Sequence, residues 1–355
     1  MPVKPWMVSL LLFGGACGDN SAEAPADAEV SPDGSDAEPS PTDAAQDATS
    51  DGADMDAGDG GQGDGGEVVA TARVDTVLTY AARNREVGVR VHYPLGTSGV
   101  HYVVLVSHGG VGMNAGETRF DHIGRAIAEH RGIGVQLGHR RSDNNQVHRL
   151  DRTLDVSLAI DGLADGTIAL PDFEGTADTE RVGHTGHSAG AYTAHAVAGA
   201  GYPYRPTPDP RVVAIAPISP QGVGDFFEAF DNGPTDNTWV TVRVPLFTMV
   251  GGAELDITGL GNFVATDWRL EPWARYPDGF DRVQIIVPDQ SHSDMGGQGG
   301  PEIMAYIGEA VATFFAAYLG GQDGICRVGT ELVPEGLTPT IERAVAAGAL
   351  LEGCP

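Results

Sequence analysis

Lysine is almost absent from this sequence of 355 residues, and Lys4 is the only one. A serine-lysine dyad and a Schiff-base lysine are therefore excluded as catalytic mechanisms. Excess positive charge is also lacking, because residues 68–355 carry 34 acidic side chains against 20 arginines. A net charge of −14 over that region repels phosphate backbones, so we expect no nucleic-acid partner.

A hydrophobic run long enough to span a bilayer is missing from the N-terminus, where the apolar stretch from Trp6 to Phe13 is too short. Residues 1–17 have the arrangement of an export signal, with one basic residue, this apolar stretch and small residues before Cys17. Small residues followed by cysteine resemble the bacterial lipoprotein processing site, although Gly14 stands where leucine is usual. The resemblance implies lipid attachment at Cys17 and a periplasmic or cell-surface protein anchored to a membrane; a plain secretory signal is the alternative.

Residues 18–68 lack basic side chains and have almost no large apolar ones. The stretch from Asp19 to Glu67 holds fifteen acidic residues and no Lys or Arg. Burial of apolar surface cannot offset the entropy of ordering such a segment, which predicts a disordered acidic linker spanning roughly 40 Å. The Asp-Gly run over residues 54–60 is similar to calcium-binding loops but has no glutamate at the twelfth position, so calcium binding is the weaker alternative.

Cysteine is scarce, with three in the chain. Once Cys17 is set aside, Cys326 and Cys354 remain as a pair 28 positions apart. An even number of cysteines in an exported protein predicts one disulfide, which closes the C-terminal tail over residues 321–355 and contributes roughly 3 kcal/mol to stability. Two unpaired cysteines are the alternative.

Strand and helix patterns alternate through residues 69–320, which form the expected catalytic domain. Strands are expected at 73–80, 86–93, 102–106, 132–137, the segment ending at 187, 212–216, 244–250 and 283–287. Helices are expected at 118–130, at 150–163, after Ser188 and at 302–319. This alternation predicts an α/β protein with a doubly wound, mainly parallel sheet that binds ligands outside the carboxyl ends of its strands.

Gly186, Ser188 and Gly190 fit the pattern G-x-S-x-G between a predicted strand and a predicted helix. In a nucleophile elbow of this kind a strained turn lifts the serine hydroxyl clear of the sheet, and neighbouring glycines make room for it. The amide of Ala189, at the start of the helix, would stabilise a developing oxyanion. A glycine-rich turn that merely contains serine is the alternative.

His292 is the base that this pattern requires. A serine hydroxyl needs a base, and the hydrolase chain order is serine, acid, histidine. Beyond Ser188 the chain has two histidines, and His195 lies two helical turns away, too far to share a proton. His292 follows the last expected strand of the domain, and a surface-loop histidine is the alternative reading.

The orienting acid should follow the strand at 244–250. Asp256 is our choice, with Glu254 as the runner-up, because either carboxylate could reach across the glycine-rich turn. Three other aspartates are less well placed: Asp225, Asp231 and Asp267. The second oxyanion donor is expected to be the amide of Gly110, in the loop 108–112 after the first buried strand.

Three further histidines near these motifs need a role. His108 is expected to brace its loop by hydrogen bonds. His184 and His187 could suggest a metal, but residues three apart on a strand point to opposite faces, so we expect structural roles. We expect neither a metal nor another cofactor.

Four blocks carry a resemblance to a known family: residues 107–110, 152–163, 181–183 and 186–192. Together they resemble the platelet-activating-factor acetylhydrolase-like and predicted dienelactone-hydrolase branch of the α/β-hydrolases, over roughly residues 70–320. The resemblance implies hydrolysis of a carboxylic ester through an acyl-serine, without a metal. True dienelactone hydrolases use cysteine where Ser188 stands.

The sequence thus predicts an exported serine carboxylesterase that acts on a small-molecule or lipid ester. Residues 143–148 and 221–239 match no known pattern and are expected to shape the acyl and alcohol pockets. A catalytically inactive surface binding module and a serine peptidase of the same fold are the alternatives.

Overall fold

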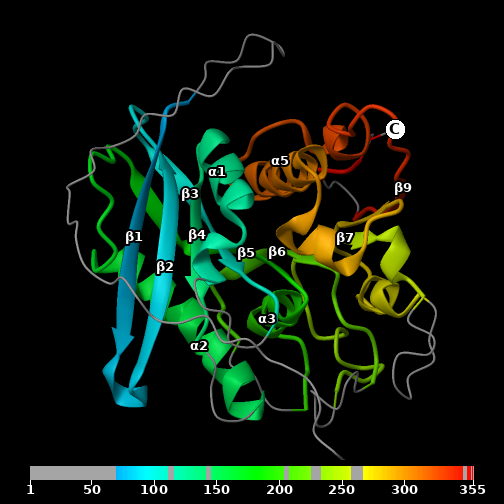
Figure 1. Ribbon diagram of the computed structural model, residues 1–355, viewed down its shortest axis with the longest axis horizontal. Coiled ribbons are helices and arrows are strands. Elements are labelled where there is room, and N and C mark those ends of the chain that lie inside the picture. Colours follow the sequence, from blue (N-terminus) through cyan, green and yellow to red (C-terminus); the bar gives the residue numbers. More distant parts are fainter. Residues whose placement is uncertain are drawn as a thin grey trace, which may run out of the picture. The chain divides into compact units, whose positions relative to one another are not determined.

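The structure is a computed structural model of the chain (Figure 1). It describes residues 69–110, 116–140, 145–203, 208–224, 233–256, 267–346, 350–352 and 354. The predicted export signal with Cys17 and the predicted acidic linker lie outside the described residues, as do Asp225 and Asp231.

A mixed, mostly parallel sheet forms the centre of the described chain. Its strands are β1 (Thr71–Tyr80), β2 (Arg85–Pro94), β3 (Val100–Ser107), β4 (Ile133–Gly138), β5 (Thr176–His187), β6 (Val212–Ile218), β7 (Leu246–Gly251), β8 (Arg282–Val287) and β9 (Thr340–Ala344). They lie in the order β1-β2-β4-β3-β5-β6-β7-β8-β9. The six strands from β4 to β8 in this order are parallel. Strand β2 pairs antiparallel with β4, β9 pairs antiparallel with β8, and β1 pairs antiparallel with β2. The predicted α/β class is therefore confirmed.

Helices cover both faces of the sheet (Figure 1). They are α1 (Asp121–Glu129), α2 (Asn145–Ala164), α3 (Ala189–Val197), α4 (Glu271–Ala274) and α5 (Pro301–Tyr318). Helices α1 and α5 share one hydrophobic core with the sheet, and α2 and α3 share a second core on the opposite face. The parallel strands connect to one another through these helices, which places their carboxyl ends along one edge of the sheet.

Strand β3 shows why the central strands are continuously apolar. Val104 and Val106 belong to the core under α1 and α5, whereas Val103 and Leu105 belong to the core under α2 and α3. Because successive side chains of a strand point to opposite faces, a strand that is covered on both sides needs apolar residues at every position.

The first two strands form a hairpin, as predicted. Asn84 adopts the left-handed conformation with φ 48°, and its N–H donates to the carbonyl of Ala81. Asparagine tolerates that conformation better than most residues, which explains why the chain reverses direction at this position.

The segment after α5 belongs to the same sheet and core. Cys326 and Cys354 are joined by a disulfide, which confirms the predicted pairing. Between the two cysteines β9 pairs antiparallel with β8 (Figure 1). Three residues of this segment, Ile325, Val328 and Leu351, are buried in the core that contains α5. The polypeptide beyond residue 320 therefore completes the sheet.

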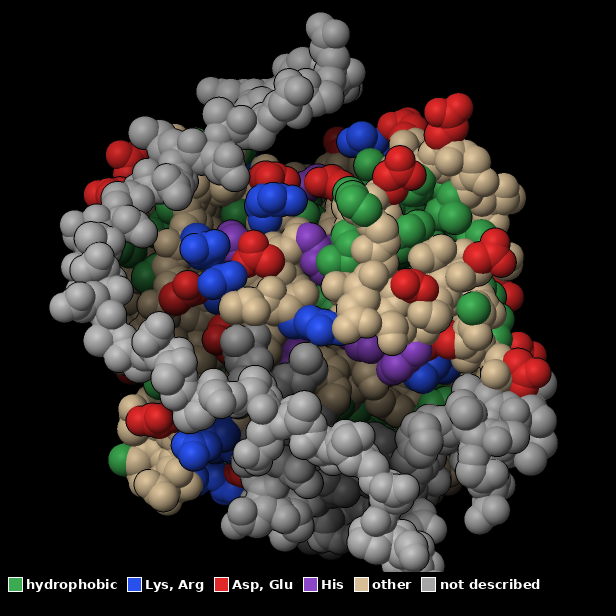
Figure 2. Space-filling view, viewed as in Figure 1, with side chains coloured by type: hydrophobic (Ala, Val, Ile, Leu, Met, Phe, Trp, Pro, Cys, Tyr) green, Lys and Arg blue, Asp and Glu red, His purple; other side chains and the backbone are tan. Residues whose placement is uncertain are grey.

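Charges of both signs are interspersed on the face shown in Figure 2, and histidines reach the surface near its centre. No helix in the described part of the chain is long and apolar enough to cross a membrane.

Candidate active site

Ser188 occupies the turn between β5 and α3. Its backbone has φ 54° and ψ −113°, a region that residues with a side chain rarely adopt, and its N–H donates to the carbonyl of Ile218 at 3.0 Å. A strained residue of this kind is held in place by its surroundings and costs of the order of 1–3 kcal/mol. Ser188 is partly exposed. Because β5 ends at His187 and α3 begins at Ala189, the predicted strand-turn-helix context of Ser188 is confirmed.

The glycines on either side of Ser188 make room for β3. A Cβ atom placed on Gly186 would lie 2.5 Å from the carbonyl oxygen of Ser107, and one placed on Gly190 would lie 2.0 Å from the same atom. Any side chain at either position would collide with that backbone. The two glycines of the sequence motif thus let the turn pack directly on the end of β3.

The loop after β3 also touches the turn. A Cβ atom on Gly109 would lie 3.2 Å from the Cβ of Ser188, and Gly110 has φ 72°, which favours glycine. Ala189 is the first residue of α3, where backbone N–H groups have no partner within the helix. The two predicted oxyanion donors, Gly110 and Ala189, thus come from segments that the structure brings together.

His292 lies in the turn after β8 and pairs with a carboxylate from the turn after β7. Its Nδ1 is 2.6 Å from Oε2 of Glu254. A proton on Nδ1 is required for this hydrogen bond to an ionised carboxylate, which leaves Nε2 as the basic nitrogen. The His292 side chain is 38% exposed, whereas that of Glu254 is 5% exposed.

Glu254 is surrounded by donors. Its Oε1 accepts hydrogen bonds from the hydroxyl of Ser219 and from the N–H of Gly251, the latter at 2.8 Å. Arg269 approaches Oε2 to 2.6 Å as a buried ion pair. Burial alone would raise the pKa of Glu254, but the hydrogen bond from His292 and the charge of Arg269 lower it below its usual range. Glu254 is consequently a fixed, ionised carboxylate.

The structure pairs His292 with Glu254, the runner-up for the orienting acid, in place of the predicted choice, Asp256. Residues Gly252–Glu254 form one turn of 3-10 helix, which carries the Glu254 side chain back under the end of β7. Asp256 follows this turn and is exposed. The runner-up, Glu254, is the residue that contacts His292. Asp267 donates its backbone N–H to Leu255 and begins the next turn.

His187 packs between the nucleophile turn and the His292 turn. The rings of His187 and His292 have centroids 4.3 Å apart, and a Cβ on Gly296 would lie 2.7 Å from the His187 ring. Burial lowers the pKa of His187 well below its usual value, and the nearby His292 and Arg269 lower it further. His187 is therefore neutral and fixes where the His292 turn sits.

Ser188 and His292 do not form a hydrogen bond with each other in this structure, although both are described. Their elements nevertheless meet, since His187 precedes Ser188 and contacts the His292 ring. Catalytic hydrogen bonds are often long or misaligned without substrate and tighten in the complex.

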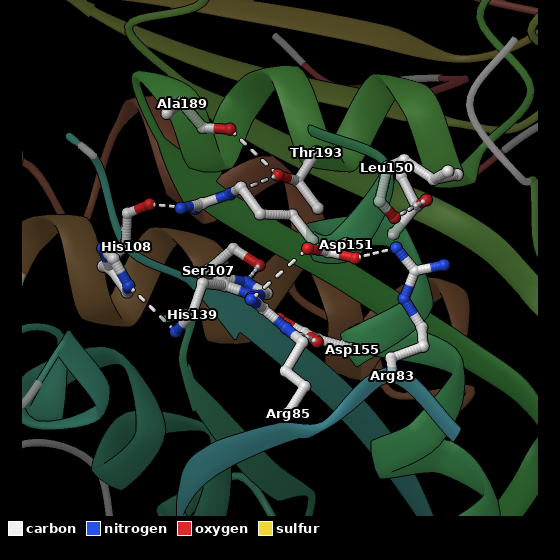
Figure 3. A network of polar contacts seen from close by, with 12 residues as sticks. Arg83, Arg85, Ser107, His108, His139, Leu150, Asp151, Asp155, Ala189 and Thr193 are labelled. Carbon is white, nitrogen blue, oxygen red and sulfur yellow. Dashed lines mark hydrogen bonds and ion pairs between the residues drawn. The ribbon is translucent and has the colours of Figure 1, made fainter. Parts of the chain in front are cut away.

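A second serine-histidine-aspartate arrangement lies beneath the turn (Figure 3). The hydroxyl of Ser107 is 2.8 Å from Nε2 of His139, and Nδ1 of His139 is 2.8 Å from Oδ2 of Asp155. Nε2 of His184 is 3.0 Å from the same hydroxyl. The proton pattern that satisfies all three contacts has His184 donating to Ser107, Ser107 donating to His139, and His139 donating to Asp155.

The second arrangement is buried, and we therefore infer that its role is structural. Ser107, His139 and Asp155 are each 0% exposed, so an ester carbonyl cannot approach the Ser107 hydroxyl. Asp155 is also held by Arg85 at 2.8 and 2.7 Å through both carboxylate oxygens. The arrangement anchors the end of β3, from which the predicted oxyanion loop begins.

The remaining predicted histidines have structural surroundings. His108 lies 2.7 Å through Nδ1 from the carbonyl of Gly109 and accepts the N–H of His139 at 3.1 Å, so its predicted role as a brace is confirmed. His184 contacts Ser107, whereas His187 contacts the His292 turn. Among the described residues, no group of three or more His, Cys, Asp or Glu is arranged to hold a metal ion.

Sequence reasoning missed the residues that support the site from a distance. Ser219 and Arg269 hold Glu254, and Arg152 and His139 hold the loop after β3. A local signal existed for Glu254, because a glutamate three residues after Gly251 can accept the N–H of that residue, as in a helix capping box.

In comparisons with known proteins, the sequence matches no protein-family model and no curated protein.

Proposed function

We propose that the chain is a serine hydrolase of the α/β-hydrolase fold that cleaves carboxylic esters. The nucleophile follows β5, the acid follows β7 and the histidine follows β8, so the chain order is Ser188, Glu254, His292. This order, together with an oxyanion loop after β3, is that of α/β-hydrolases and supports the fold assignment. The resemblance to the platelet-activating-factor acetylhydrolase-like branch supports the choice of an ester.

In the proposed reaction Ser188 Oγ attacks the ester carbonyl while His292 Nε2 takes its proton. The oxyanion that forms accepts hydrogen bonds from the amides of Ala189 and Gly110. Glu254 orients the imidazole and stabilises its charged form. His292 then gives the proton to the departing alcohol, and water attacks the acyl-serine by the same steps in reverse to release the acid.

One observation carries the proposal: a strained, partly exposed serine at a strand-to-helix turn directly follows His187, whose ring contacts that of His292, and Nδ1 of His292 is engaged by a buried carboxylate. The strain at Ser188 has no evident structural purpose, since glycine would fit the same turn without cost. The Glu254–His292 pair leaves Nε2 of His292 as a basic nitrogen that can take up a proton.

The test is turnover of short-chain p-nitrophenyl esters together with labelling by a fluorophosphonate. Ser188→Ala and His292→Ala should each remove nearly all activity, and their losses should be far from additive because the residues act as one unit. Glu254→Gln should lower kcat by roughly three to four orders of magnitude. Asp256→Asn, which removes a neighbouring charge in the same loop, should change kcat less than threefold and serves as the matched control.

An active Ser188→Ala protein would exclude this mechanism. A larger loss in Asp256→Asn than in Glu254→Gln would exclude Glu254 as the acid and restore the assignment that the sequence favours.

The missing hydrogen bond between Ser188 and His292 favours one second candidate, a surface binding module that retains the hydrolase scaffold without its activity. Fluorophosphonate labelling separates the two functions. A labelled Ser188 requires an activated nucleophile, whereas an unlabelled, folded wild-type protein supports the binding module.

Export and lipid attachment at Cys17 remain part of the proposal, supported by the sequence of residues 1–17 and by the disulfide, which is typical of oxidising compartments. Mass spectrometry of the mature N-terminus should find a diacylated Cys17. An intact Met1, or an unmodified cysteine, would contradict the lipoprotein assignment.

A further inference from the structure

We propose that Arg152 positions the oxyanion hole by hydrogen bonds that hold the loop after β3 against helix α3. We call this set of hydrogen bonds the Arg152 clamp. The inference rests on the proposed function and adds to it a residue that neither touches substrate nor exchanges a proton. Its basis is a set of hydrogen bonds that joins the two segments expected to supply the oxyanion donors (Figure 3).

On the loop side, the guanidinium of Arg152 donates through one terminal nitrogen to the carbonyl of His108. That carbonyl shares a peptide plane with the N–H of Gly109, and the expected donor, the N–H of Gly110, is the next amide along. Fixing the His108 carbonyl therefore limits how the following amides can turn. The loop is further held by the contacts of the His108 ring with Gly109 and His139.

On the helix side, Nε of Arg152 donates to the hydroxyl of Thr193 at 2.9 Å. The same hydroxyl donates to the carbonyl of Ala189 at 2.9 Å. Thr193 thus links Arg152 to the first turn of α3. The amide of Ala189, at the start of that turn, is the other expected donor. Arg152 therefore bonds to both segments.

The environment of Arg152 shows that directional hydrogen bonds, and not a surface ion pair, account for its position. The residue is 1% exposed, and burial lowers its pKa to about 9. Arg152 donates to an uncharged carbonyl and an uncharged hydroxyl, while the neighbouring carboxylate of Asp155 is held by Arg85. A guanidinium can serve two acceptors in a fixed plane, which an ammonium group cannot do.

Misplacement of a catalytic group by about 1 Å can lower a rate by about a hundredfold, and removal of one oxyanion donor costs about 10²–10³ in kcat. The clamp should therefore act on the transition state and not on binding of the ground state. Its loss should lower kcat and leave KM nearly unchanged.

The experiment compares purified full-length Arg152→Lys with the wild type. We expect kcat for p-nitrophenyl butyrate to fall between tenfold and a hundredfold, and KM to change less than twofold. The affinity for an alkyl boronic acid, which forms a tetrahedral adduct with the serine, should fall by the same factor as kcat/KM. Thr193→Val, which keeps Arg152 and its charge, should lose activity in the same pattern, and the double variant should lose less than the product of the two.

Arg282→Lys is the matched control. Arg282 is also a buried arginine that donates to backbone carbonyls, those of Trp273 and Tyr276, but it lies at the amino end of β8, away from the site. This variant should lower Tm as Arg152→Lys does and leave kcat within twofold of the wild type.

The outcomes separate the two proposals. A wild-type protein that neither hydrolyses esters nor reacts with the fluorophosphonate overturns the proposed function and the clamp together. An active wild type whose Arg152→Lys variant keeps its kcat, or loses kcat only as much as Arg282→Lys, overturns the clamp alone. If Arg152→Lys fails to fold, unchanged kcat and boronate affinity in Thr193→Val also overturn it.

Discussion

Ser188 has backbone angles that suit glycine, φ 54° and ψ −113°. We expect Ser188→Gly to be more stable than Ser188→Ala by about 1 kcal/mol, although glycine elsewhere usually costs 0.5–1 kcal/mol relative to alanine. Urea unfolding of both variants measures the difference. Ser293 provides the control, because its right-handed helical backbone, with φ −73°, should make Ser293→Ala the more stable of that pair. The same order at both positions would show that the Ser188 turn stores no strain.

The sequence predicts where single residues lie in the fold when local chemistry decides their position, and it fails when packing between distant segments decides it. Ser188 and His292 followed from a motif and from chain order. The choice between Glu254 and Asp256 depended on the conformation of the turn after β7. The single 3-10 turn Gly252–Glu254 buries Glu254 and leaves Asp256 exposed, the opposite of what we expected. Ser219 and Arg269 could not be found, because their roles exist only after β6 and the turn Trp268–Leu270 have come together around Glu254.

Among the elements, the bounds of the central strands were predicted to within two residues, because burial on both faces requires unbroken apolar runs. The expected strand at 102–106 corresponds to β3, and that at 283–287 to β8. Strand β9 was missed. Its sequence, Thr340–Ala344, alternates weakly and contains Glu342 and Arg343, so its strand structure comes from pairing with β8 and not from its own pattern.

The disulfide fastens β9 to the rest of the domain, which gives a prediction for this element. Replacing Cys326 and Cys354 together by serine should lower the free energy of unfolding by roughly 3 kcal/mol, as expected for a closed loop of this size. Hydrogen exchange should become faster in β8 and β9 first, while ester turnover at 25 °C stays within twofold, because β9 lies on the side of β8 away from β7, which leads into Glu254. Equal acceleration of exchange across β3 and β5 would contradict this local role.

At the scale of the whole molecule, buried histidines determine how stability depends on pH. Burial lowers the pKa of His122 to about 4 and of His184 and His195 to about 3. In the unfolded chain these groups take up protons below about pH 6.5, whereas the folded protein does not. Because the unfolded state then binds more protons, stability must fall as the pH drops from 6.5 to 4, by up to about 1.4 kcal/mol per pH unit for each histidine.

Urea titrations at a series of pH values test this dependence. The slope of unfolding free energy against pH between 6.5 and 4 should correspond to several protons, and His195→Leu should reduce it by about one. The lowered pKa of Glu254 and of Asp209 adds a further loss as the pH falls below the ordinary carboxyl range, because the unfolded chain then binds protons that the folded carboxylates do not yet take up. A flat profile between pH 6.5 and 5 would contradict the neutral, buried state of these histidines.

Strand β9 has one more consequence, which concerns self-association. Without it, β8 would be the edge of the sheet, and its residues Arg282–Val287 form a β-branched, mostly apolar segment with a single charge. An exposed edge of that composition is a template for pairing with another chain and for cross-β assembly. Strand β9 pairs with this edge and carries the charged residues Glu342 and Arg343, so a polar strand lies next to the mostly apolar β8. A chain shortened to residue 320 should therefore form oligomers or fibrils at concentrations at which the full chain stays monodisperse in light scattering.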